Sequence, residues 1–316
     1  MSKGKVTVLG INGHIGRAAA RAFVDAGWSV SGMARTNRAP LPGVTFIKGD
    51  AGVRSDIEAA IAGADVVMNA LNLPYDKWDK GRAEAQLATV IAAMGDSGKT
   101  MMYPGNVYNY AATDRVMTPA TPQHPETPRG AIRVRQEQML ERAAKAGKFQ
   151  AIIIRAGDFF GPDNTGDWFD QAMMMDVSKG KIHHMGGLET AHTWAYLPDL
   201  GAAFAQLAEQ RQTLAAFENF HFEGHYVTHG ALMAAIQNAA PRPVTVTPLN
   251  WLMFQLLSLA VPILREVLKM RYLWNNPMKL SDSRLEAMLG PDFGTPLNAA
   301  VAASVGKFFV EKKLAA

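Results

Sequence analysis

Three glycines near the start of the chain have the spacing of a phosphate-binding turn. Gly10, Gly13 and Gly16 stand three residues apart, between a β-branched segment at 5–9 and an alanine-rich segment at 17–24. A strand, a glycine turn and a helix place backbone N–H groups and a helix N-terminus against a pyrophosphate. The motif therefore predicts a dinucleotide site, surrounded by Gly10, Asn12, Gly13, His14, Ile15 and Gly16. The alternative is a tight turn that needs glycine for its backbone conformation and binds nothing.

The residues after a second predicted strand, at 28–33, bear on which dinucleotide binds. Sites that prefer NAD usually place an Asp or Glu there, where the carboxylate binds the ribose 2′-hydroxyl. This chain has Arg35 and Arg38 at that point and no carboxylate. A guanidinium group can pair with a 2′-phosphate, so the sequence favours NADP over NAD. The alternative is that both arginines belong to a solvated surface turn, which suits Arg38 better.

Composition and charge exclude several classes of protein. The chain has 316 residues, of which 48% are apolar and 19% charged, as in a globular protein with a sizeable core. The net charge of +4 is not gathered into a Lys/Arg run, which argues against a nucleic-acid partner. The absence of cysteine removes disulfides and thiolate nucleophiles, and it fits the reducing cytoplasm.

Neither a membrane span nor a metal site is expected. The longest apolar stretch, 249–264, is interrupted by Asn250, Gln255, Ser258 and Pro262, and is too short to cross a bilayer. We expect it in the core or at the contact of a homodimer; a pocket lid and a membrane-surface helix are the alternatives. The adjacent His183 and His184 would point to opposite faces of a strand, so they do not indicate a metal site.

Strand and helix patterns alternate along the first half of the chain. Strands are expected at 5–9, 28–33, 44–47, 64–70, 100–103 and 149–155, and helices at 17–24, 53–62, 80–94 and 131–146. This order predicts an α/β protein with a doubly wound parallel sheet, the Rossmann fold. We expect a dinucleotide-binding domain at 1–160 and a smaller α+β substrate lobe at 161–316. Segments around 188–222 are expected to return to the first domain.

These motifs together resemble the extended and atypical short-chain dehydrogenase/reductase superfamily, in its NAD-dependent epimerase/dehydratase branch. The resemblance covers nearly the whole chain. Besides the glycine triplet, it rests on Gly49-Asp50, Gly105-Asn106-Val107-Tyr108, the segment 153–162 and the segment 192–199. It implies that the glycines surround the pyrophosphate and that Asp50, with Ala51 beside it, reaches the adenine ring. It also implies that Ala70 and Leu71 line the adenosine side of the cofactor. The alternative for Asp50 is that it forms a turn or caps the next helix.

The chain departs from this family at the catalytic residues. The family has Ser or Thr after the fifth strand and Tyr-x-x-x-Lys on the next helix, whereas this chain has Pro104, Arg129 and Arg133 at those positions. Proline has no proton to give, and arginine stays protonated. Arg133 could still hold the ribose or a phosphate as a fixed cation, and Arg129 could stabilise an oxyanion.

Another group must then donate the proton, if the protein is an enzyme. Tyr108 is the first candidate because it comes just after the fifth strand, where the ligand is expected; a structural tyrosine is the alternative. Asp158 follows the sixth strand, and it could instead cap the next segment. His192 and Tyr196 belong to a segment that borders the substrate in the family.

The sequence predicts an NADP-dependent oxidoreductase of the epimerase/dehydratase type, acting on a small organic carbonyl or alcohol. The loss of the triad leaves open a non-catalytic, NADP-binding regulator that senses redox state. A nucleotide-sugar epimerase or dehydratase is a second alternative. It is weakened because such reactions begin with an alcohol oxidation that the missing Tyr and Lys would perform.

Overall fold

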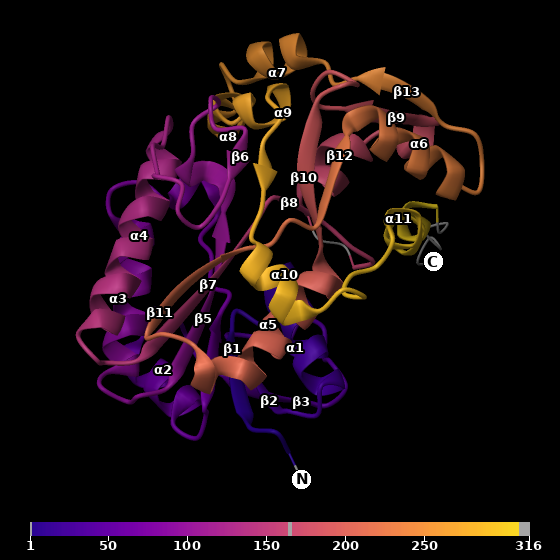
Figure 1. Ribbon diagram of the computed structural model, residues 1–316. Coiled ribbons are helices and arrows are strands. Elements are labelled where there is room, and N and C mark those ends of the chain that lie inside the picture. Colours follow the sequence, from indigo (N-terminus) through magenta and orange to yellow (C-terminus); the bar gives the residue numbers. More distant parts are fainter. Residues whose placement is uncertain (1, 164–165, 310–316) are drawn as a thin grey trace.

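A seven-stranded parallel sheet forms the centre of the protein. The computed structural model describes residues 2–163 and 166–309, and Figure 1 shows the sheet between two layers of helices. The strands lie in the order β11-β7-β5-β4-β1-β2-β3, and every neighbouring pair is parallel. Their bounds are β1 (Lys5–Leu9), β2 (Ser29–Ala34), β3 (Val44–Lys48), β4 (Val66–Asn69), β5 (Thr100–Asn106), β7 (Gln150–Ala156) and β11 (Phe217–His221). The prediction of a doubly wound Rossmann sheet is confirmed.

The central strands are buried on both faces because helices cover both. β4 is buried throughout its length, as is nearly all of β7, and this explains why their sequences are apolar runs and not alternating patterns. One apolar layer packs α1 (His14–Asp25) with α5 (Leu197–Gln210) against the sheet. The opposite layer contains α2 (Arg54–Ile61), α3 (Arg82–Met94) and α4 (Pro128–Lys145).

The strand order reverses between β1 and β4. From β1 the chain runs outward through β2 and β3, then returns to the other side of β1 as β4. The carboxyl ends of β1 and β4 lead into Gly10 and Ala70, so the loops on either side diverge and leave space at that edge. Both α5 and β11 belong to this layered unit. The domain boundary expected at residue 160 stays a prediction.

The rest of the chain forms a smaller lobe above the carboxyl edge of the sheet (Figure 1). Its short strands are β6 (Val116–Met117), β8 (Asp158–Phe160), β9 (Lys181–His184), β10 (Ala191–Tyr196), β12 (His225–Thr228), β13 (Thr245–Pro248) and β14 (Lys279–Leu280). Its helices are α6 (His229–Ala239), α7 (Trp251–Leu257), α8 (Pro262–Lys269), α9 (Tyr272–Asn275) and α11 (Leu297–Val305), whereas α10 (Ser283–Leu289) packs on α5 beside the large sheet. A separate apolar cluster around the fully buried Trp194, Trp274 and Phe169 holds the lobe together.

The apolar stretch at 249–264 does not lie in the core as a whole. It forms α7 and the start of α8, and its Leu252, Leu256 and Leu259 are 65%, 62% and 76% exposed. The expectation of a core segment is therefore wrong for these side chains, whereas a homodimer contact stays a prediction. Among the described residues, no helix combines the length and the apolar character needed to cross a membrane.

Candidate functional site

The glycine turn occupies the point where the strand order reverses. Gly10 has φ +86°, and a Cβ there would lie 2.9 Å from the carbonyl oxygen of Ala70. A Cβ on Gly16 would lie 2.4 Å from the carbonyl oxygen of Gly10, so both positions need glycine for the chain to pack. Gly13 differs, because a Cβ there meets only the Gly10 oxygen at 3.3 Å. Gly13 is the N-cap of α1, whose first N–H groups have no partner within the helix.

Two hollows meet at this turn and share Gly10, Gly13, Leu71 and Asn72. The outer hollow, of about 670 Å³, lies toward the ends of β2 and β3 and includes Arg35, Arg38, Asp50 and Ala51. The inner cleft, of about 660 Å³, runs between the sheet edge and the smaller lobe. The shared residues make the two hollows one elongated site along the carboxyl edge of the sheet.

Arg35 and Arg38 line the outer hollow. Both are exposed, and neither guanidinium group makes an ion pair or hydrogen bond within residues 2–163 and 166–309. The Asn12 amide donates to the Thr36 carbonyl at 2.7 Å and accepts from the Arg38 N–H at 3.3 Å, which ties their loop to the glycine turn. Asp50 accepts from the Gly52 N–H at 2.9 Å, so it supports a turn as well as lining the hollow.

Arg133 supplies a fixed cation to the wall of the inner cleft. Its guanidinium group donates to the Tyr103 hydroxyl at 2.6 Å and lies 4.4 Å from the centre of the Trp78 ring. The side chain is buried, and its Nε has no hydrogen-bond partner among the residues that the structure describes. Because Tyr103 and Trp78 fix the position of this charge, Arg133 is placed to hold an anionic or hydroxylated ligand.

Arg129 lies one turn earlier on α4 and does not line the cleft. Its guanidinium group lies 3.2 Å from the Glu266 carboxylate of α8 and 4.0 Å from the centre of the Tyr75 ring, and it donates to the Tyr75 carbonyl. These contacts fix α8 and the segment η1 (Tyr75–Lys77) above the cleft. The structure therefore does not bring Arg129 to the other candidate residues.

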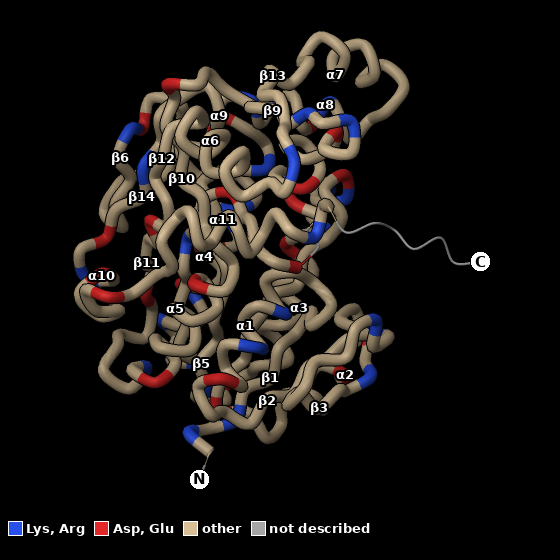
Figure 2. The backbone as a smooth tube through the Cα atoms, turned by 90° about the vertical axis from the view of Figure 1, so that its right-hand side faces the viewer, with Lys and Arg blue, Asp and Glu red and all other residues tan. Residues whose placement is uncertain are grey.

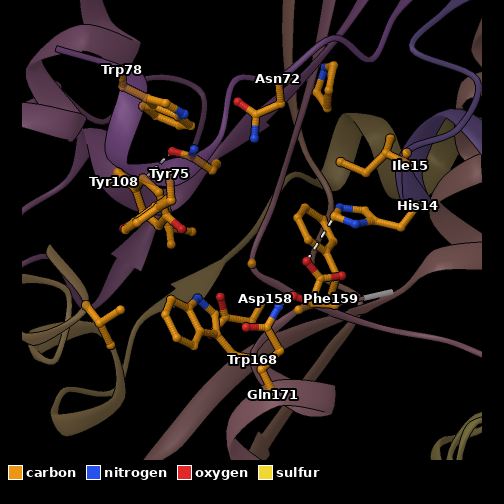
Figure 3. Close-up of a pocket in the computed structure, with 18 of the residues that line it drawn as sticks. His14, Ile15, Asn72, Tyr75, Trp78, Tyr108, Asp158, Phe159, Trp168 and Gln171 are labelled. Carbon is orange, nitrogen blue, oxygen red and sulfur yellow. Dashed lines mark hydrogen bonds and ion pairs between the residues drawn. The ribbon is translucent and has the colours of Figure 1, made fainter. Parts of the chain in front are cut away.

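Tyr108 follows β5 in the short segment η2 (Val107–Asn109) and lines the inner cleft beside Tyr75 (Figure 3). Burial raises the pKa of its hydroxyl above the usual value, and the charge of Asp158 raises it further. The hydroxyl thus stays protonated at neutral pH. Tyr108 can donate a hydrogen bond to a substrate oxygen, but it is a weak acid.

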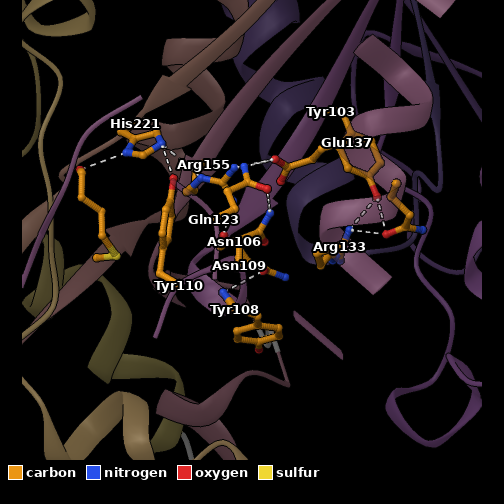
Figure 4. A network of polar contacts seen from close by, with 12 residues as sticks. Tyr103, Asn106, Tyr108, Asn109, Tyr110, Gln123, Arg133, Glu137, Arg155 and His221 are labelled. Atoms are coloured by element: carbon orange, nitrogen blue, oxygen red, sulfur yellow. Dashed lines mark hydrogen bonds and ion pairs between the residues drawn. The ribbon is translucent and has the colours of Figure 1, made fainter. Parts of the chain in front are cut away.

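A buried polar network holds the segment that carries Tyr108 (Figure 4). Arg155 on β7 pairs with Glu137 on α4 at 2.7 Å, and it donates to the Asn106 carbonyl and, at 3.2 Å, to His221 Nε2. Burial lowers the pKa of His221 to about 3, so its ring is neutral and accepts this bond. The network joins α4, β5 and β7 directly beneath the cleft.

Loss of the Glu137 carboxylate should therefore destabilise the fold. We expect Glu137→Ala to lower the free energy of unfolding by about 3–5 kcal/mol, because Arg155 would keep a buried charge without its partner. Glu141→Ala on the same helix is the control, since it removes only the exposed pair with Lys145, worth about 0–1 kcal/mol. Urea denaturation measures both, and equal losses would contradict this reading of the network.

Asp158 and His192 form a hydrogen-bonded pair at the inner cleft. Asp158 begins β8 and His192 lies on β10, and these strands pair side by side. Asp158 Oδ2 lies 3.0 Å from His192 Nε2 and accepts from Trp274 Nε1 at 2.6 Å. Asp158 lines the cleft, and its Oδ1 has no hydrogen-bond partner in the described part of the chain. His192 lies behind it and is only 1% exposed.

The hydrogen bonds fix how many protons this pair holds. His192 Nδ1 lies 3.1 Å from the Leu273 carbonyl oxygen, which can only accept, so Nδ1 carries a proton. The contact between His192 Nε2 and Asp158 Oδ2 then needs one further proton, carried by either partner. His229 stacks on His192 with ring centres 6.2 Å apart, and burial lowers the pKa of His229 to about 4, so it is neutral. A single proton at the Nε2–Oδ2 contact would complete the hydrogen bonding of this pair.

The other predicted residues lie as follows. Ala70, His14 and Ile15 line the inner cleft, and His14 lies 3.5 Å from the carboxylate of Asp167 (Figure 3). Tyr196 does not line it, and its ring packs on Phe160. Sequence reasoning missed several residues that line the cleft, namely Asn72, Tyr75, Trp78, Gln171 and Val267, whereas Phe254 belongs to the stretch 249–264, for which a pocket lid is one of the alternatives given above. The signal for Tyr75 and Trp78 was their aromatic character just after the predicted strand at 64–70.

A family model and many solved structures are similar to this chain. Residues 6–221 match the family model described as the NAD dependent epimerase/dehydratase family. A search of curated protein sequences found no match. Many solved structures share the fold, at identities below 25%, where the likeness concerns the fold alone.

Three of these structures show the levels of identity and structural similarity. The Bordetella bronchiseptica enzyme WbmH in complex with NAD+ has 19% identity and a TM-score of 0.71, with 96% of this chain and 98% of that chain covered. UDP-glucose 4-epimerase from Brucella ovis in complex with NAD has 14% identity, a TM-score of 0.76 and the same coverage. UDP-glucuronic acid 4-epimerase from Bacillus cereus, with UDP-glucuronic acid and NAD, has 14% identity, a TM-score of 0.75 and again the same coverage.

Proposed function

The chain belongs to the NAD dependent epimerase/dehydratase family, an enzyme family of the short-chain dehydrogenase/reductase type, and we propose that it is an NADP-dependent oxidoreductase. Its substrate would be a small organic carbonyl compound or the corresponding alcohol. The observation that carries this proposal is the Asp158–His192 pair, since Asp158 lines the cleft and its Oδ1 has no hydrogen-bond partner among the described residues.

The residues at the sheet edge fit a dinucleotide. Gly13 leaves open space in front of the first turn of α1, where a pyrophosphate would accept backbone N–H bonds. Asp50 and Ala51 would lie beside the adenine, and Ala70 and Leu71 beside the adenosine and the pyrophosphate. Arg133 would hold the nicotinamide ribose, which would engage its unpaired Nε or a neighbouring N–H. The nicotinamide ring, when bound, supplies or accepts a hydride.

The preference for NADP rests on the outer hollow alone. The similar solved structures named above hold NAD or NAD+. Here, however, two unpaired guanidinium groups face the hollow, and Asp50 is the only carboxylate among the residues that line it in the described chain. Arg35 directly follows β2, where a 2′-phosphate would lie, and it would form charge-assisted hydrogen bonds to that phosphate.

We expect the protein to bind NADPH more tightly than NADH, and Arg35→Asp to reduce NADPH affinity by about 10- to 100-fold. The new carboxylate would repel a 2′-phosphate but accept a bond from a 2′-hydroxyl, so NADH affinity should hold or rise. Arg54→Asp, which makes the same charge change outside the hollow, is the control. Fluorescence titration measures all three proteins, and equal affinities of the wild type for the two cofactors would refute the preference.

Proton transfer would fall to Asp158. In the reductive direction the proton shared at the Nε2–Oδ2 contact would move to the other carboxyl oxygen of Asp158, Oδ1, and from there to the developing alkoxide, leaving a carboxylate and a neutral imidazole. Trp274 Nε1 would stabilise that carboxylate through its hydrogen bond. Tyr108, on the same cleft, would orient the substrate oxygen by a hydrogen bond, since its raised pKa makes it the weaker acid. Alcohol oxidation would run the same transfer backward.

An uncharged carbonyl compound and a nucleotide sugar would need different side chains in the inner cleft. A nucleotide sugar carries a diphosphate, and Arg133 is the one arginine or lysine among the described residues that line the cleft. Much of the wall is apolar, with Trp78, Trp168, Phe254 and Val267. These features favour an uncharged substrate over a nucleotide sugar, and membership of an enzyme family favours catalysis over a regulator.

A substrate screen tests this choice. The wild-type protein with NADPH is offered uncharged aldehydes and ketones in one arm and keto forms of nucleotide sugars in the other, and NADPH consumption is followed. We expect turnover in the first arm. Turnover confined to nucleotide sugars would replace the proposed substrate class with the alternative.

A further inference from the structure

The segment that joins α7 to α8 exposes an unusual amount of apolar surface. We call residues 251–269 the α7–α8 hairpin. Of the 11 large apolar side chains that are exposed among the described residues, 7 lie in this hairpin, and Leu259 is the most exposed at 76%. No charged residue occurs between Arg242 and Arg265. Figure 2 shows α7 projecting from the body of the molecule without a charged position.

The hairpin is held in this exposed arrangement by its own contacts. The Arg265 guanidinium group donates to the carbonyls of Ser258 and Leu259 at 2.8 and 2.9 Å, which closes the turn. Trp251 stacks on the buried Trp274 and donates from Nε1 to the Met185 carbonyl at 3.0 Å. The exposed leucines therefore cannot turn into the core without breaking these contacts.

The inner side of the same hairpin forms a wall of the cleft. Phe254, Ile263, Leu264 and Val267 line the inner cleft. Ile263 is also 39% exposed, so this side chain belongs both to the outer apolar surface of the hairpin and to the lining of the cleft. A soluble protein rarely exposes an apolar patch of this kind unless something binds it.

Cations surround the base of the uncharged tip. Lys269 is 47% exposed at the end of α8, and Arg271 follows it. Lys77 lies on η1, against which α8 packs. Residues 249–272 hold three cations, Arg265, Lys269 and Arg271, against one carboxylate, Glu266, which pairs with Arg129 and Lys269. The neighbouring η1 adds one charge of each sign, Asp76 and Lys77, so positive charge is in excess. An apolar tip backed by cations fits a bilayer whose surface carries anionic phosphates.

We propose that the α7–α8 hairpin inserts into the surface of an anionic lipid bilayer, and that the inner cleft receives its carbonyl substrate from that bilayer. The substrate would be a lipid-soluble ketone or aldehyde that enters past Ile263. This substrate class rests on the proposed function, whereas the membrane contact does not. A second copy of the chain is a poorer occupant, because a symmetric contact would bring the two sets of cations together.

Vesicle sedimentation with purified protein tests the contact without any assay of turnover. We expect the wild type to bind vesicles of phosphatidylcholine with phosphatidylglycerol, and to bind pure phosphatidylcholine more weakly. Leu256→Asp/Leu259→Asp should reduce binding to the anionic vesicles at least about tenfold, because it places charge in the apolar tip. Leu188→Asp, at another exposed leucine, is the control and should bind as the wild type does.

Site-specific labelling locates the contact, since the chain has no cysteine. An environment-sensitive fluorophore on Leu257→Cys should shift to shorter wavelength with anionic vesicles, and one on Leu188→Cys should not. Two results would overturn the proposal: no binding of the wild type to either vesicle, or a wild-type dimer that Leu256→Asp/Leu259→Asp converts to monomer. In each case a water-soluble carbonyl compound would still be reduced if the proposed function holds.

Discussion

Asp158→Asn lowers turnover by about 10²–10⁴-fold, the usual loss when a general acid is removed, and leaves NADPH affinity nearly unchanged. The variant keeps the shape of the side chain and an acceptor for Trp274 Nε1, so the site stays assembled. It loses the group that exchanges a proton with His192 and the substrate oxygen. Single-turnover measurements with saturating NADPH separate this loss from weaker binding.

Two controls make the result specific. Asp176 forms a comparable pair with His183, at 2.9 Å, but outside the cleft, so Asp176→Asn should turn over as the wild type does. Tyr108→Phe removes one hydrogen bond to the substrate and should cost about tenfold. A loss of turnover of about 10²–10⁴-fold in Tyr108→Phe, together with a small loss in Asp158→Asn, would show that the tyrosine is the proton donor.

Gly13→Val removes cofactor binding and leaves the fold intact, which is the second large effect. Gly13 has φ −80° and ψ 156°, an extended conformation that valine adopts readily, and the added Cβ would lie 3.3 Å from the Gly10 carbonyl oxygen, a tight contact that a shift of a few tenths of an ångström relieves. Loss of two charge-assisted bonds to the pyrophosphate corresponds to at least about 100-fold in the dissociation constant for NADPH. Titration and thermal unfolding measure the two properties separately.

Gly16→Ala is the matched contrast. Its Cβ would lie 2.4 Å from the Gly10 carbonyl oxygen, so this smaller substitution should destabilise the protein itself. A folded Gly13→Val variant that binds NADPH at wild-type affinity would show that the turn does not hold the pyrophosphate.

The sequence predicted the parts of this protein that depend on local patterns. The glycine spacing, the buried strands and the arginines after β2 are each contained within a few residues, and the fold follows from their order. The Asp158–His192 pair depends on strand pairing between β8 and β10, across 34 positions, so sequence reasoning proposed the two residues separately and not as a pair.

Two other features could not be predicted for the same reason. Arg129 and Arg133 lie one turn apart on α4, and only tertiary packing shows that Glu266 and Tyr75 engage the first while the second lines the cleft. Residues 249–264 are as apolar as a core helix. Their exposure follows from the contacts of Trp251 and Arg265, which no periodicity encodes.

Hydride transfer from a labelled cofactor tests the central claim most directly. NADPH deuterated at nicotinamide C4 is incubated with the wild-type protein and a panel of aldehydes and ketones, lipid-soluble ones included, and the products are analysed by mass spectrometry. The account predicts an alcohol with deuterium on the former carbonyl carbon, formed much more slowly by Asp158→Asn. Tight NADPH binding with no deuterium in any product would contradict it and indicate a protein that binds the cofactor without using it.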